Sequence, residues 1–423
     1  MQSLYNIYLQ HPQICIDTRK ISRDCLFFAL KGPNFNANKF AIQALEKGAS
    51  YAIVDEEKYV LDDRYILVED SLKTLQELAN YHRKQLSCPI LGITGTNGKT
   101  TSKELCLQVL KQKFKTLATE GNLNNHIGVP LSLLSIDPDT EFAIIEMGAN
   151  HLGEIEFLCS LAEPDYGVIT NVGKAHLEGF GSLEGVLQTK TELYRYLAKK
   201  NAPIFIKDNH QILIEKMPPN CPTISYGQLN SSSCNIRSKG AQPFVKVLVD
   251  GIEIQSRLIG DYNFDNIALS IAVGMEFGIG IKDIKQAIES YVPTNNRSQL
   301  IKTESNTVLL DAYNANPMSI EKAINNLANI EQPNKVMILG DMFELGEAAN
   351  KEHINMINHC LSSGITEVHF VGEIFNGLNK TGYKSYDNTG SLIEQLKKQP
   401  ITDAFILIKG SRGMKLEQLV EYL

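Results

Sequence analysis

A glycine-rich loop carries the clearest chemistry in the sequence. Residues 92–101 read GITGTNGKTT and begin within PILGIT, an apolar run at residues 89–94 that predicts a buried strand. A bound triphosphate needs converging backbone N–H groups without a Cβ in the way, a cation, and a hydroxyl for Mg²⁺. Lys99 can reach the β- and γ-phosphates, and Thr100 can ligate the metal. The loop therefore predicts an ATP site that contains Gly95, Thr96, Asn97, Gly98, Lys99, Thr100 and Thr101.

The spacing of this loop departs from the ordinary Walker motif. Ile93 stands where the first glycine of that motif is expected, and Gly95 comes two residues later. This spacing, together with the lack of an Asn-Lys-x-Asp guanine motif, disfavours a GTPase-like switch. The alternative interpretation is a glycine turn with a surface lysine, which the strand–loop–helix context makes the weaker one.

Two further chemical groups stand where predicted strands end. Glu146 closes the apolar run FAIIEMG and is a candidate Mg²⁺ ligand, with a solvated rim residue as the alternative. His176 follows the strand pattern of YGVITNV. A lone histidine is usually structural, but α/β sheets bind ligands at the carboxyl ends of their strands. We therefore expect His176 to be functional.

Length and composition limit the class of protein. A chain of 423 residues suggests roughly three domains, and a net charge of −7 does not favour a nucleic acid as partner. The eight cysteines are scattered without a CxxC pair, as expected for reduced thiols in a cytosolic protein. No run of about 18 apolar residues predicts a membrane span, and the N-terminus lacks the pattern of a signal peptide. We expect a cytoplasmic protein without membrane insertion.

The order of predicted elements indicates an α/β fold with three domains. Residues 1–86 alternate short strands (ICIDTR, CLFFAL, YAIVD) with helices, including one over 39–47 and one capped by Ser71. Residues 87–296 predict a mostly parallel sheet around the phosphate loop, then a hairpin at Asp250-Gly251 and a helix from about Asn263. Residues 297–423 predict a Rossmann-like unit with strands at TVLLDAY, KVMILGDM, EVHFVG and AFILIKG.

The loop GTNGKT, Glu146 in IEMGAN and His176 in AHLEGFGS together resemble the ATP-dependent Mur ligases, over essentially the whole chain. The resemblance implies a small N-terminal UDP-substrate domain, a central P-loop-type ATPase domain and a C-terminal domain that binds the incoming amine. The segments GNLNNHIGVP, DAYNANPMS, LGDMFELGE and IKGSRGMKLE are similar to those of family members that join D-Ala-D-Ala to UDP-MurNAc-tripeptide, a peptidoglycan precursor. No Asp-Asn-Pro-Arg segment of a diaminopimelate-adding ligase is present.

The resemblance implies activation of a carboxylate by ATP as an acyl phosphate, with two Mg²⁺ ions. Lys99, His176 and Lys190 would be the catalytic residues, and the metal ligands would be Thr100, Glu146, His176 and Lys190. Lys190, in QTKTELY, matches the family's carbamylated lysine, whose modification turns an ammonium into a carboxylate-like ligand. Without the family, an ordinary helix-surface lysine would be the simpler interpretation.

The rest of the ATP molecule is expected between domains. Asn263 and Asn266 lie one helical turn apart on one face, and the family pattern favours Asn266 for adenine. Arg297 resembles an arginine that reaches phosphate or ribose, and Asp311 a ribose-contacting aspartate. Helix capping by Asn263 and a rim salt bridge of Arg297 remain alternatives.

The substrates are expected in two further places. Thr18 and Arg19, in IDTR, resemble the UDP-sugar segment, although the pattern nearby departs from the family at Asn36-Ala37-Asn38. Asn124 and Asn125 would line the channel for UDP-MurNAc-tripeptide, with a polar turn as the alternative. For D-Ala-D-Ala, Arg412 is the first candidate to bind its carboxylate. The other candidates at strand ends are Asn314, Asn316, Asp341, Lys409 and Ser411, while Asp341 and Glu344 could instead organise the last domain.

Other functions remain open. Another Mur ligase that adds a single amino acid is the nearest alternative, and folylpolyglutamate synthase would leave the N-terminal domain unexplained. A non-catalytic nucleotide-binding regulator on the same fold would be expected to lose one of Lys99, Glu146, His176 and Lys190, but all four are present. We expect a monomer.

Overall fold

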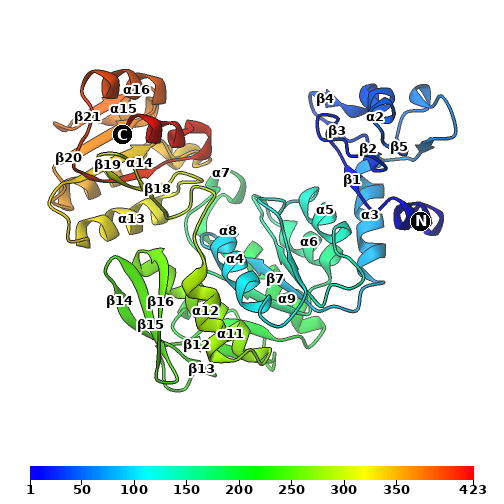
Figure 1. Ribbon diagram of the computed structural model, residues 1–423, viewed down its shortest axis with the longest axis horizontal. Coiled ribbons are helices and arrows are strands. Elements are labelled where there is room, and N and C mark those ends of the chain that lie inside the picture. The colour runs from blue at the N-terminus through cyan, green and yellow to red at the C-terminus, as the bar shows by residue number, and fades with distance from the viewer.

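The N-terminal unit of the computed structural model, which describes residues 1–423, is a four-stranded parallel sheet in the order β1-β2-β5-β6 (Figure 1). Its elements are α1 (Gln2–Gln10), β1 (Ile14–Cys15), β2 (Leu26–Phe28), the hairpin β3 (Lys31–Gly32) and β4 (Phe35–Asn36), η1 (Ala37–Phe40), α2 (Ala41–Glu46), β5 (Tyr51–Val54), η2 (Glu57–Tyr59), β6 (Tyr65–Leu67) and α3 (Ser71–Arg83). The predicted strands are present but shorter than their apolar runs.

The start of α3 differs from the prediction. Asp70, not Ser71, is the N-cap residue, because its side chain accepts a hydrogen bond from the backbone N–H of Lys73. Ser71 is the first helical residue, and its hydroxyl donates to the carbonyl oxygen of Ala29 in the sheet. Helix α3 packs against α5 and α6 of the central unit and so joins the two units.

The central unit is a seven-stranded parallel sheet in the order β13-β12-β11-β10-β7-β9-β8. Its strands are β7 (Ile90–Thr94), β8 (Thr116–Ala118), β9 (Phe142–Glu146), β10 (Tyr166–Ile169), β11 (Ile204–Lys207), β12 (Thr223–Gly227) and β13 (Cys234–Asn235). Its helices are α4 (Lys99–Leu110), α5 (Gly128–Leu134), α6 (Glu154–Ala162), α7 (Leu177–Phe180), α8 (Leu183–Lys190), α9 (Glu192–Lys199), α10 (Gln211–Ile214), η3 (Asp261–Asn263), α11 (Phe264–Glu276) and α12 (Ile281–Ser290).

Helices cover both faces of the central sheet, which explains why its strands are continuously apolar. Along β9, Phe142 and Ile144 enter the core formed with α4, α11 and α12. Ala143 and Ile145 enter the opposite core, formed with α5, α6, α8 and α9. Side chains alternate between the faces of a strand, so a strand buried on both faces shows no polar alternation.

A three-stranded antiparallel sheet follows, made of β14 (Arg237–Ala241), β15 (Phe244–Val249) and β16 (Ile252–Ile259). The predicted hairpin is confirmed: Asp250 and Gly251 have φ of 48° and 77°, as a two-residue turn with both residues left-handed requires. The polar strand β14 was not predicted.

The C-terminal unit is a six-stranded sheet in the order β17-β18-β22-β19-β20-β21, with only the β17 edge antiparallel. The four predicted strands are β18 (Thr307–Asp311), β19 (Lys335–Gly340), β20 (Glu367–Val371) and β22 (Phe405–Lys409). The unpredicted edge strands are β17 (Gln299–Lys302) and β21 (Lys384–Tyr386). Its helices are α13 (Pro317–Asn329), η4 (Gly346–Ala348), α14 (Ala349–Ser362), α15 (Glu373–Leu378), α16 (Thr389–Lys398), η5 (Arg412–Met414) and η6 (Leu416–Tyr422).

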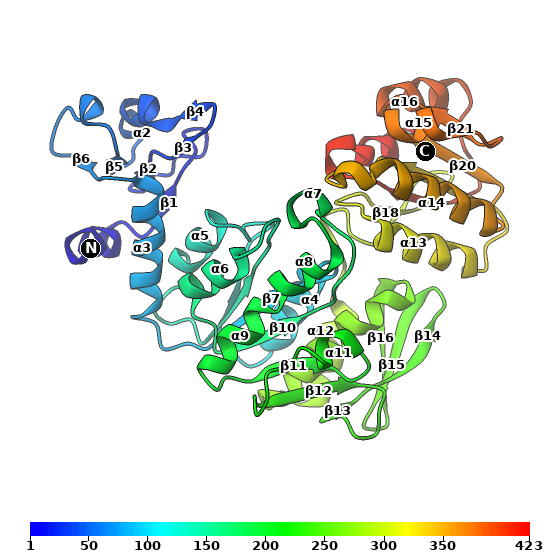
Figure 2. The ribbon, with the colours of Figure 1, turned by 180° about the vertical axis from the view of Figure 1, so that it is seen from behind.

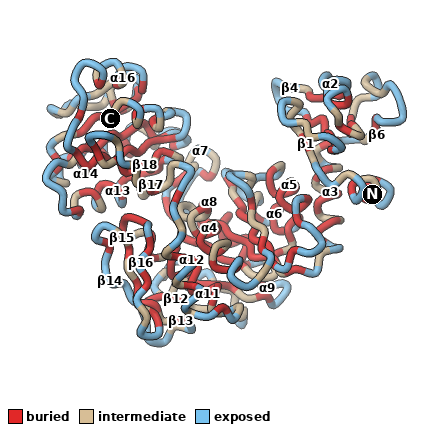
Figure 3. The backbone as a smooth tube through the Cα atoms, in the orientation of Figure 1, coloured by how far each residue is buried: buried red, intermediate tan, exposed pale blue.

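The N-terminal and C-terminal units lie on opposite sides of the central one, as Figures 1 and 2 show from two directions. Each unit has buried strands and helix faces of its own (Figure 3). The loops that leave β7 and β10 meet the C-terminal unit, because Asn97 contacts Asn316 and Gly173 lies against Met318. No helix has the length and apolar character needed to cross a bilayer.

Candidate active site

The phosphate loop has the backbone conformation that its glycines predict. Gly95 and Gly98 have φ of 140° and 79°, and α4 begins directly after Gly98. A Cβ on Gly95 would lie 2.0 Å from the hydroxyl oxygen of Thr170, and one on Gly98 would lie 2.5 Å from Asn266 Oδ1. Both glycines are therefore required by backbone conformation and by close packing.

Lys99 projects from the first turn of α4 back toward this loop. Its ammonium donates hydrogen bonds to the carbonyl oxygens of Gly95, at 2.7 Å, and Thr96, at 3.1 Å. Burial lowers the pKa of Lys99, while the nearby Glu146 carboxylate opposes that shift. The lysine is thus a desolvated cation next to the backbone that would cradle phosphate.

Glu146 ends β9 beside the start of α4, as the sequence predicts. Its Oε2 accepts a hydrogen bond from the Thr100 hydroxyl at 2.8 Å, and its Oε1 accepts one from Asn124 Nδ2 at 2.8 Å. A buried carboxylate and a hydroxyl side by side are hard oxygen donors of the kind that Mg²⁺ prefers. These two side chains fit one magnesium ion.

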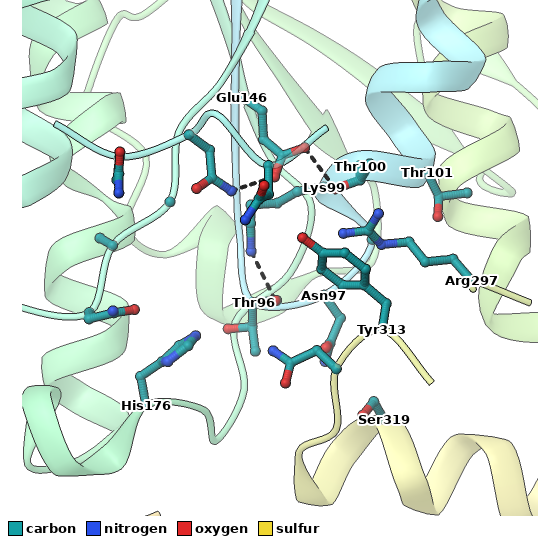
Figure 4. A pocket seen from close by; sticks show the side chains of 18 of the residues that line it. Thr96, Asn97, Lys99, Thr100, Thr101, Glu146, His176, Arg297, Tyr313 and Ser319 are labelled. Atoms are coloured by element: carbon teal, nitrogen blue, oxygen red, sulfur yellow. Dashed lines mark hydrogen bonds between the residues drawn. The ribbon is translucent and has the colours of Figure 1, made fainter. Parts of the chain in front are cut away.

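These groups line a cavity of ≈ 480 Å³ between the central and C-terminal units (Figure 4). Most of the predicted site residues line it: Thr96, Asn97, Gly98, Lys99, Thr100, Thr101, Asn124, Asn125, Glu146, His176, Asn263, Asn266, Arg297, Asp311, Asn314 and Lys409. Residues that were predicted separately in the central and C-terminal units therefore line the same cavity.

Asn263 and Asn266 form a relay at the start of α11. Asn263 Nδ2 donates to the carbonyl oxygen of Ile259 at 2.8 Å, and Asn266 Nδ2 donates to Asn263 Oδ1 at 2.8 Å. Asn266 Oδ1 accepts from the hydroxyl of Ser102 at 3.0 Å. The relay fixes both amides on the cavity wall, next to the loop at Gly98. Asn263 is the N-cap residue of α11 by position, but its side chain makes no capping hydrogen bond.

Arg297 and Asp311 lie at the C-terminal wall of the cavity. The guanidinium carbon of Arg297 is 3.5 Å from the ring centroid of Tyr313, and that of Arg412 is 5.0 Å from it. Asp311 Oδ2 accepts a hydrogen bond from Lys409 Nζ at 2.7 Å, and its Oδ1 accepts the N–H of Ser298 at 3.2 Å. Two arginines therefore face one tyrosine, a positive surface suited to an anionic ligand.

Lys190 ends α8 and is buried without a carboxylate partner. The nearest acceptor of its Nζ is the carbonyl oxygen of Ala149 at 3.5 Å, and the Phe180 ring centroid is 5.5 Å away. Burial, with a smaller contribution from the positive charge of Lys99, lowers the pKa of Lys190 to about 7. Such an amine is substantially neutral at physiological pH, which is the form that reacts with CO₂. Lys190 does not itself line the cavity.

The unmodified side chains form only part of a metal site. No cluster of three or more His, Cys, Asp or Glu side chains is close enough to hold an ion. The Glu146–Thr100 pair is present, and His176 lines the same cavity. A second ion in this cavity would therefore need donors beyond the carboxylate and the histidine present.

Several predicted substrate residues have partners within the protein. The buried Asp341 accepts the N–H groups of Ile374 and Phe375 at 3.0 and 2.9 Å, so its carboxylate holds the first turn of α15. This arrangement matches the alternative that Asp341 organises the domain, and leaves no free carboxylate for substrate. The Ser411 hydroxyl accepts the N–H of Phe343 at 2.9 Å.

Other predicted residues lie at the edge of the cavity or far from it. Asn316 is the N-cap residue of α13 and its Nδ2 donates to Asn97 Oδ1 at 2.8 Å. Asn125 Oδ1 accepts the N–H of Gly128 at 2.9 Å, which is the polar-turn alternative. Thr18 and Arg19 lie in the N-terminal unit outside the cavity, where exposed Arg19 pairs with Asp17 at 2.7 Å.

Sequence reasoning missed some of the cavity wall. Tyr313 was not singled out, although it lies between the predicted residues Asp311 and Asn314 just past the end of β18. Its position just past a predicted strand end was the signal that could have identified it. The other polar residues of the wall that were not predicted are Asn122, His126, Asn150, His151, Glu154, Tyr262, Ser298 and Ser319.

Comparisons with known proteins agree with this geometry. The Mur ligase middle domain matches residues 93–274, and the Mur ligase, glutamate ligase domain matches residues 296–412. The UDP-N-acetylmuramoyl-tripeptide–D-alanyl-D-alanine ligases of Bacillus subtilis and Escherichia coli are 33% and 34% identical to the chain. The alignments cover 97% of this chain in both cases, and 92% and 93% of those proteins.

A solved structure supports the same assignment. The MurF ligase from Thermotoga maritima in complex with ADP matches with a TM-score of 0.85 at 26% identity, over 98% of this chain and 97% of that one. The segments that match the two family domains include the phosphate loop and the residues that line the cavity. The two relatives match at more than 30% identity over nearly their full length. The chain therefore belongs to the Mur ligase family.

Proposed function

We propose that the chain is an ATP-dependent amide ligase that adds D-alanyl-D-alanine to UDP-MurNAc-tripeptide, forming the UDP-MurNAc-pentapeptide precursor of peptidoglycan. One observation carries the proposal: a phosphate loop and a basic wall from a different domain face each other across one cavity. The names of the B. subtilis and E. coli relatives support the choice of substrates.

The first step activates the tripeptide carboxylate. A carboxylate oxygen attacks the γ-phosphorus of ATP, the bond to the ADP oxygen breaks, and an acyl phosphate forms. This step brings two anions together, so positive charge must neutralise them. Lys99 supplies that charge once phosphate oxygens replace Gly95 and Thr96 as its hydrogen-bond partners. Arg297 would approach the phosphates or ribose from the opposite wall, and Asp311 would contact the ribose.

The second step forms the amide. The amine of the dipeptide attacks the acyl carbon, the carbon–oxygen bond to phosphate breaks, and the nitrogen loses a proton. We propose that the C-terminal domain holds the dipeptide, with exposed Arg412, beside Tyr313, on its carboxylate and with Asn314 and Lys409 on the cavity wall. Asn124 would line the path of the tripeptide.

Two Mg²⁺ ions complete the proposed site, where they would screen the charges of the phosphates and the carboxylate. Thr100 and Glu146 would hold the first ion, while His176 and a carbamylated Lys190 would contribute to the second. The support for carbamylation is the isolated, buried amine with its pKa lowered to about 7. A Lys190→Ala variant should then regain activity when a short carboxylic acid is added. Full activity of Lys190→Ala without it would contradict this assignment.

The remaining parts of the proposal concern the whole chain. We propose domains at 1–86, 87–296 and 297–423, with Thr18 and Arg19 of the first domain on the UDP group. We also propose a monomer that works in the cytoplasm, where UDP-activated substrates are available.

Phosphate release from ATP tests the proposed function. Purified protein with Mg²⁺ and UDP-MurNAc-tripeptide should release phosphate only when D-Ala-D-Ala is added, and the UDP product should gain the mass of one dipeptide. Release with a single amino acid in place of the dipeptide would move the enzyme to another step of the family. ATP binding without turnover on any amine would favour a nucleotide-binding regulator.

A further inference from the structure

Two close contacts between polar side chains join the loop after β10 to the C-terminal domain. His176 Nδ1 pairs with Glu344 Oε2, and Lys174 Nζ lies 2.8 Å from Glu352 Oε1. Both carboxylates belong to the segment between β19 and the first turns of α14. In Figures 1 and 2, α7, which directly follows His176, lies at the junction of the two domains, and it contacts η4 of the C-terminal domain. The loop therefore docks on one defined part of the other domain.

The backbone on both sides is shaped for this contact. His176 and Glu344 have φ of 50° and 63°, in the left-handed region that residues other than glycine rarely adopt. The N–H of Glu178 donates to the carbonyl oxygen of Glu344 at 3.4 Å. Such conformations persist only where the surrounding structure holds them. The pairing of His176 with Glu344 is therefore a built feature of the two loops.

The imidazole ring presents different nitrogens to the two domains. Nδ1 faces Glu344, so Nε2 is the nitrogen left for a ligand in the cavity that His176 lines. Figure 4 shows His176 on the same side of that cavity as Thr96. Glu344 lies beside Nδ1 without a hydrogen bond of good geometry, and Nδ1 has no other partner in the protein. A carboxylate in this place that accepts Nδ1–H fixes the tautomer and the ring orientation, and makes Nε2 a better electron-pair donor.

The ion pair of Lys174 with Glu352 holds the His176–Glu344 contact in place. Glu352 is buried, and its carboxylate also accepts a hydrogen bond from Asn355 Nδ2 at 3.2 Å. Lys174 is half exposed and is the cation that reaches it from the central domain. Loss of Lys174 would leave a buried carboxylate without its counterion, which is unfavourable. The pair thus favours the domain position in which Glu344 reaches His176.

We propose that Glu344 is a positioning residue: from the C-terminal domain, it orients His176 so that Nε2 can serve the ATP site of the central domain. The Lys174–Glu352 pair keeps the domains where this contact forms. The inference rests on the proposed function and adds a coupling to it. Through Glu344, the orientation of His176 in the central site depends on the position of the C-terminal domain.

Kinetics of Glu344 variants separate orientation from charge. In Glu344→Gln the amide oxygen can still accept Nδ1–H, whereas Glu344→Ala removes the acceptor. We expect kcat to fall about 10- to 100-fold in Glu344→Ala and much less in Glu344→Gln, with KM for D-Ala-D-Ala unchanged in both. Equal losses in the two variants, or wild-type kcat in Glu344→Ala, would overturn the proposal.

Binding of Mn²⁺ provides a readout that needs no turnover. With ADP present, Mn²⁺ affinity followed by electron paramagnetic resonance should fall about tenfold in Glu344→Ala and remain near wild type in Glu344→Gln. Unchanged affinity in Glu344→Ala would contradict a role for Glu344 in orienting His176.

Hydrogen–deuterium exchange tests the docking itself. Exchange of residues 172–180 should increase in Lys174→Met and in Glu344→Ala. Glu394→Gln, which breaks the Lys397–Glu394 pair within α16, is the matched control and should leave that segment unchanged. Equal protection in all variants would refute the docking contact. If the wild type turns over no substrate, the proposed function fails, while exchange and Mn²⁺ affinity still decide the inference.

Discussion

The ammonium of Lys99 donates a 2.7 Å hydrogen bond to the carbonyl oxygen of Gly95, within the loop that should receive phosphate. Phosphate must therefore draw the lysine away from backbone carbonyls, at a site where burial has already lowered its pKa. We expect Lys99→Met to reduce kcat by about 10²- to 10³-fold, because a preorganised charge facing the transition state is lost. Steady-state phosphate release measures this effect. Lys111→Met, at the exposed residue directly after the same helix, should keep wild-type kcat.

Gly98 should tolerate no side chain. A Cβ there would meet Asn266 Oδ1 at 2.5 Å, so Gly98→Ala should displace the asparagine relay and weaken ATP binding by at least about tenfold, or 1.4 kcal/mol. Isothermal titration with ATP measures the loss. Gly251→Ala is the control, because φ is similar, 77° against 79°, and nothing lies within 4 Å of its Cβ. That variant should lose about 1 kcal/mol of stability and no affinity for ATP.

Lys190 should make folding stability depend on pH. Its pKa is about 7 in the folded protein and 10.5 in the unfolded chain. Below pH 7 the lysine is charged in both states, and the unfavourable burial of that charge lowers the free energy of unfolding by its full amount. This destabilisation fades as pH rises from 7 toward 10.5, where the unfolded lysine also loses its proton. Lys190→Met should therefore melt at a higher temperature than wild type at pH 6, in CO₂-depleted buffer, and the difference should shrink by pH 9.

The same variant should lack ligase activity at every pH, since methionine cannot be carbamylated. Lys199→Met changes an exposed lysine at the end of α9 and should show neither effect. A melting difference that is constant between pH 6 and pH 9 would rule out a lowered pKa for Lys190.

The hydroxyl of Tyr194 is buried in the central core without a hydrogen-bond partner. Because an unpaired buried polar group is unfavourable, Tyr194→Phe should leave the free energy of unfolding unchanged or raise it by up to about 1 kcal/mol. Chemical denaturation measures the difference. Tyr8→Phe is the contrasting variant, since that hydroxyl donates to the carbonyl oxygen of Leu134 at 2.7 Å, and it should lose about 1 kcal/mol. A clear loss of stability in Tyr194→Phe would mean that its hydroxyl has a partner.

Much of the fold follows from local sequence patterns. Strands β7 and β9 were predicted because both of their faces are buried, which makes FAII apolar up to Glu146 at the strand end. The hairpin at Asp250-Gly251 was predicted because few residue pairs suit two left-handed positions. The edge strands β17 and β21 were missed, since QLIK and KSY are short and only partly buried. The cap at Asp70 was missed by one residue, because serine is as good an N-cap as aspartate.

The candidate site was predictable only where the type of a residue and its place after a strand together indicate a chemical role. Lys99, Thr100 and Glu146 follow strand ends, and the parallel sheet brings such ends to one edge. Contacts between residues of different domains could not be predicted in this way. Nothing near Glu344 indicates that it pairs with His176, since that contact exists only after two domains dock. Asp341 shows the converse: a carboxylate past a strand end whose partners are backbone N–H groups of a later helix.

Transfer of labelled oxygen tests the proposed chemistry most directly. UDP-MurNAc-tripeptide labelled with ¹⁸O in its reacting carboxylate would be incubated with ATP, Mg²⁺, D-Ala-D-Ala and the enzyme. An acyl phosphate intermediate predicts one ¹⁸O in each released phosphate, matched by one pentapeptide product. Phosphate without ¹⁸O, formed alongside the pentapeptide or in its absence, would contradict activation of the carboxylate by ATP and with it the proposed mechanism.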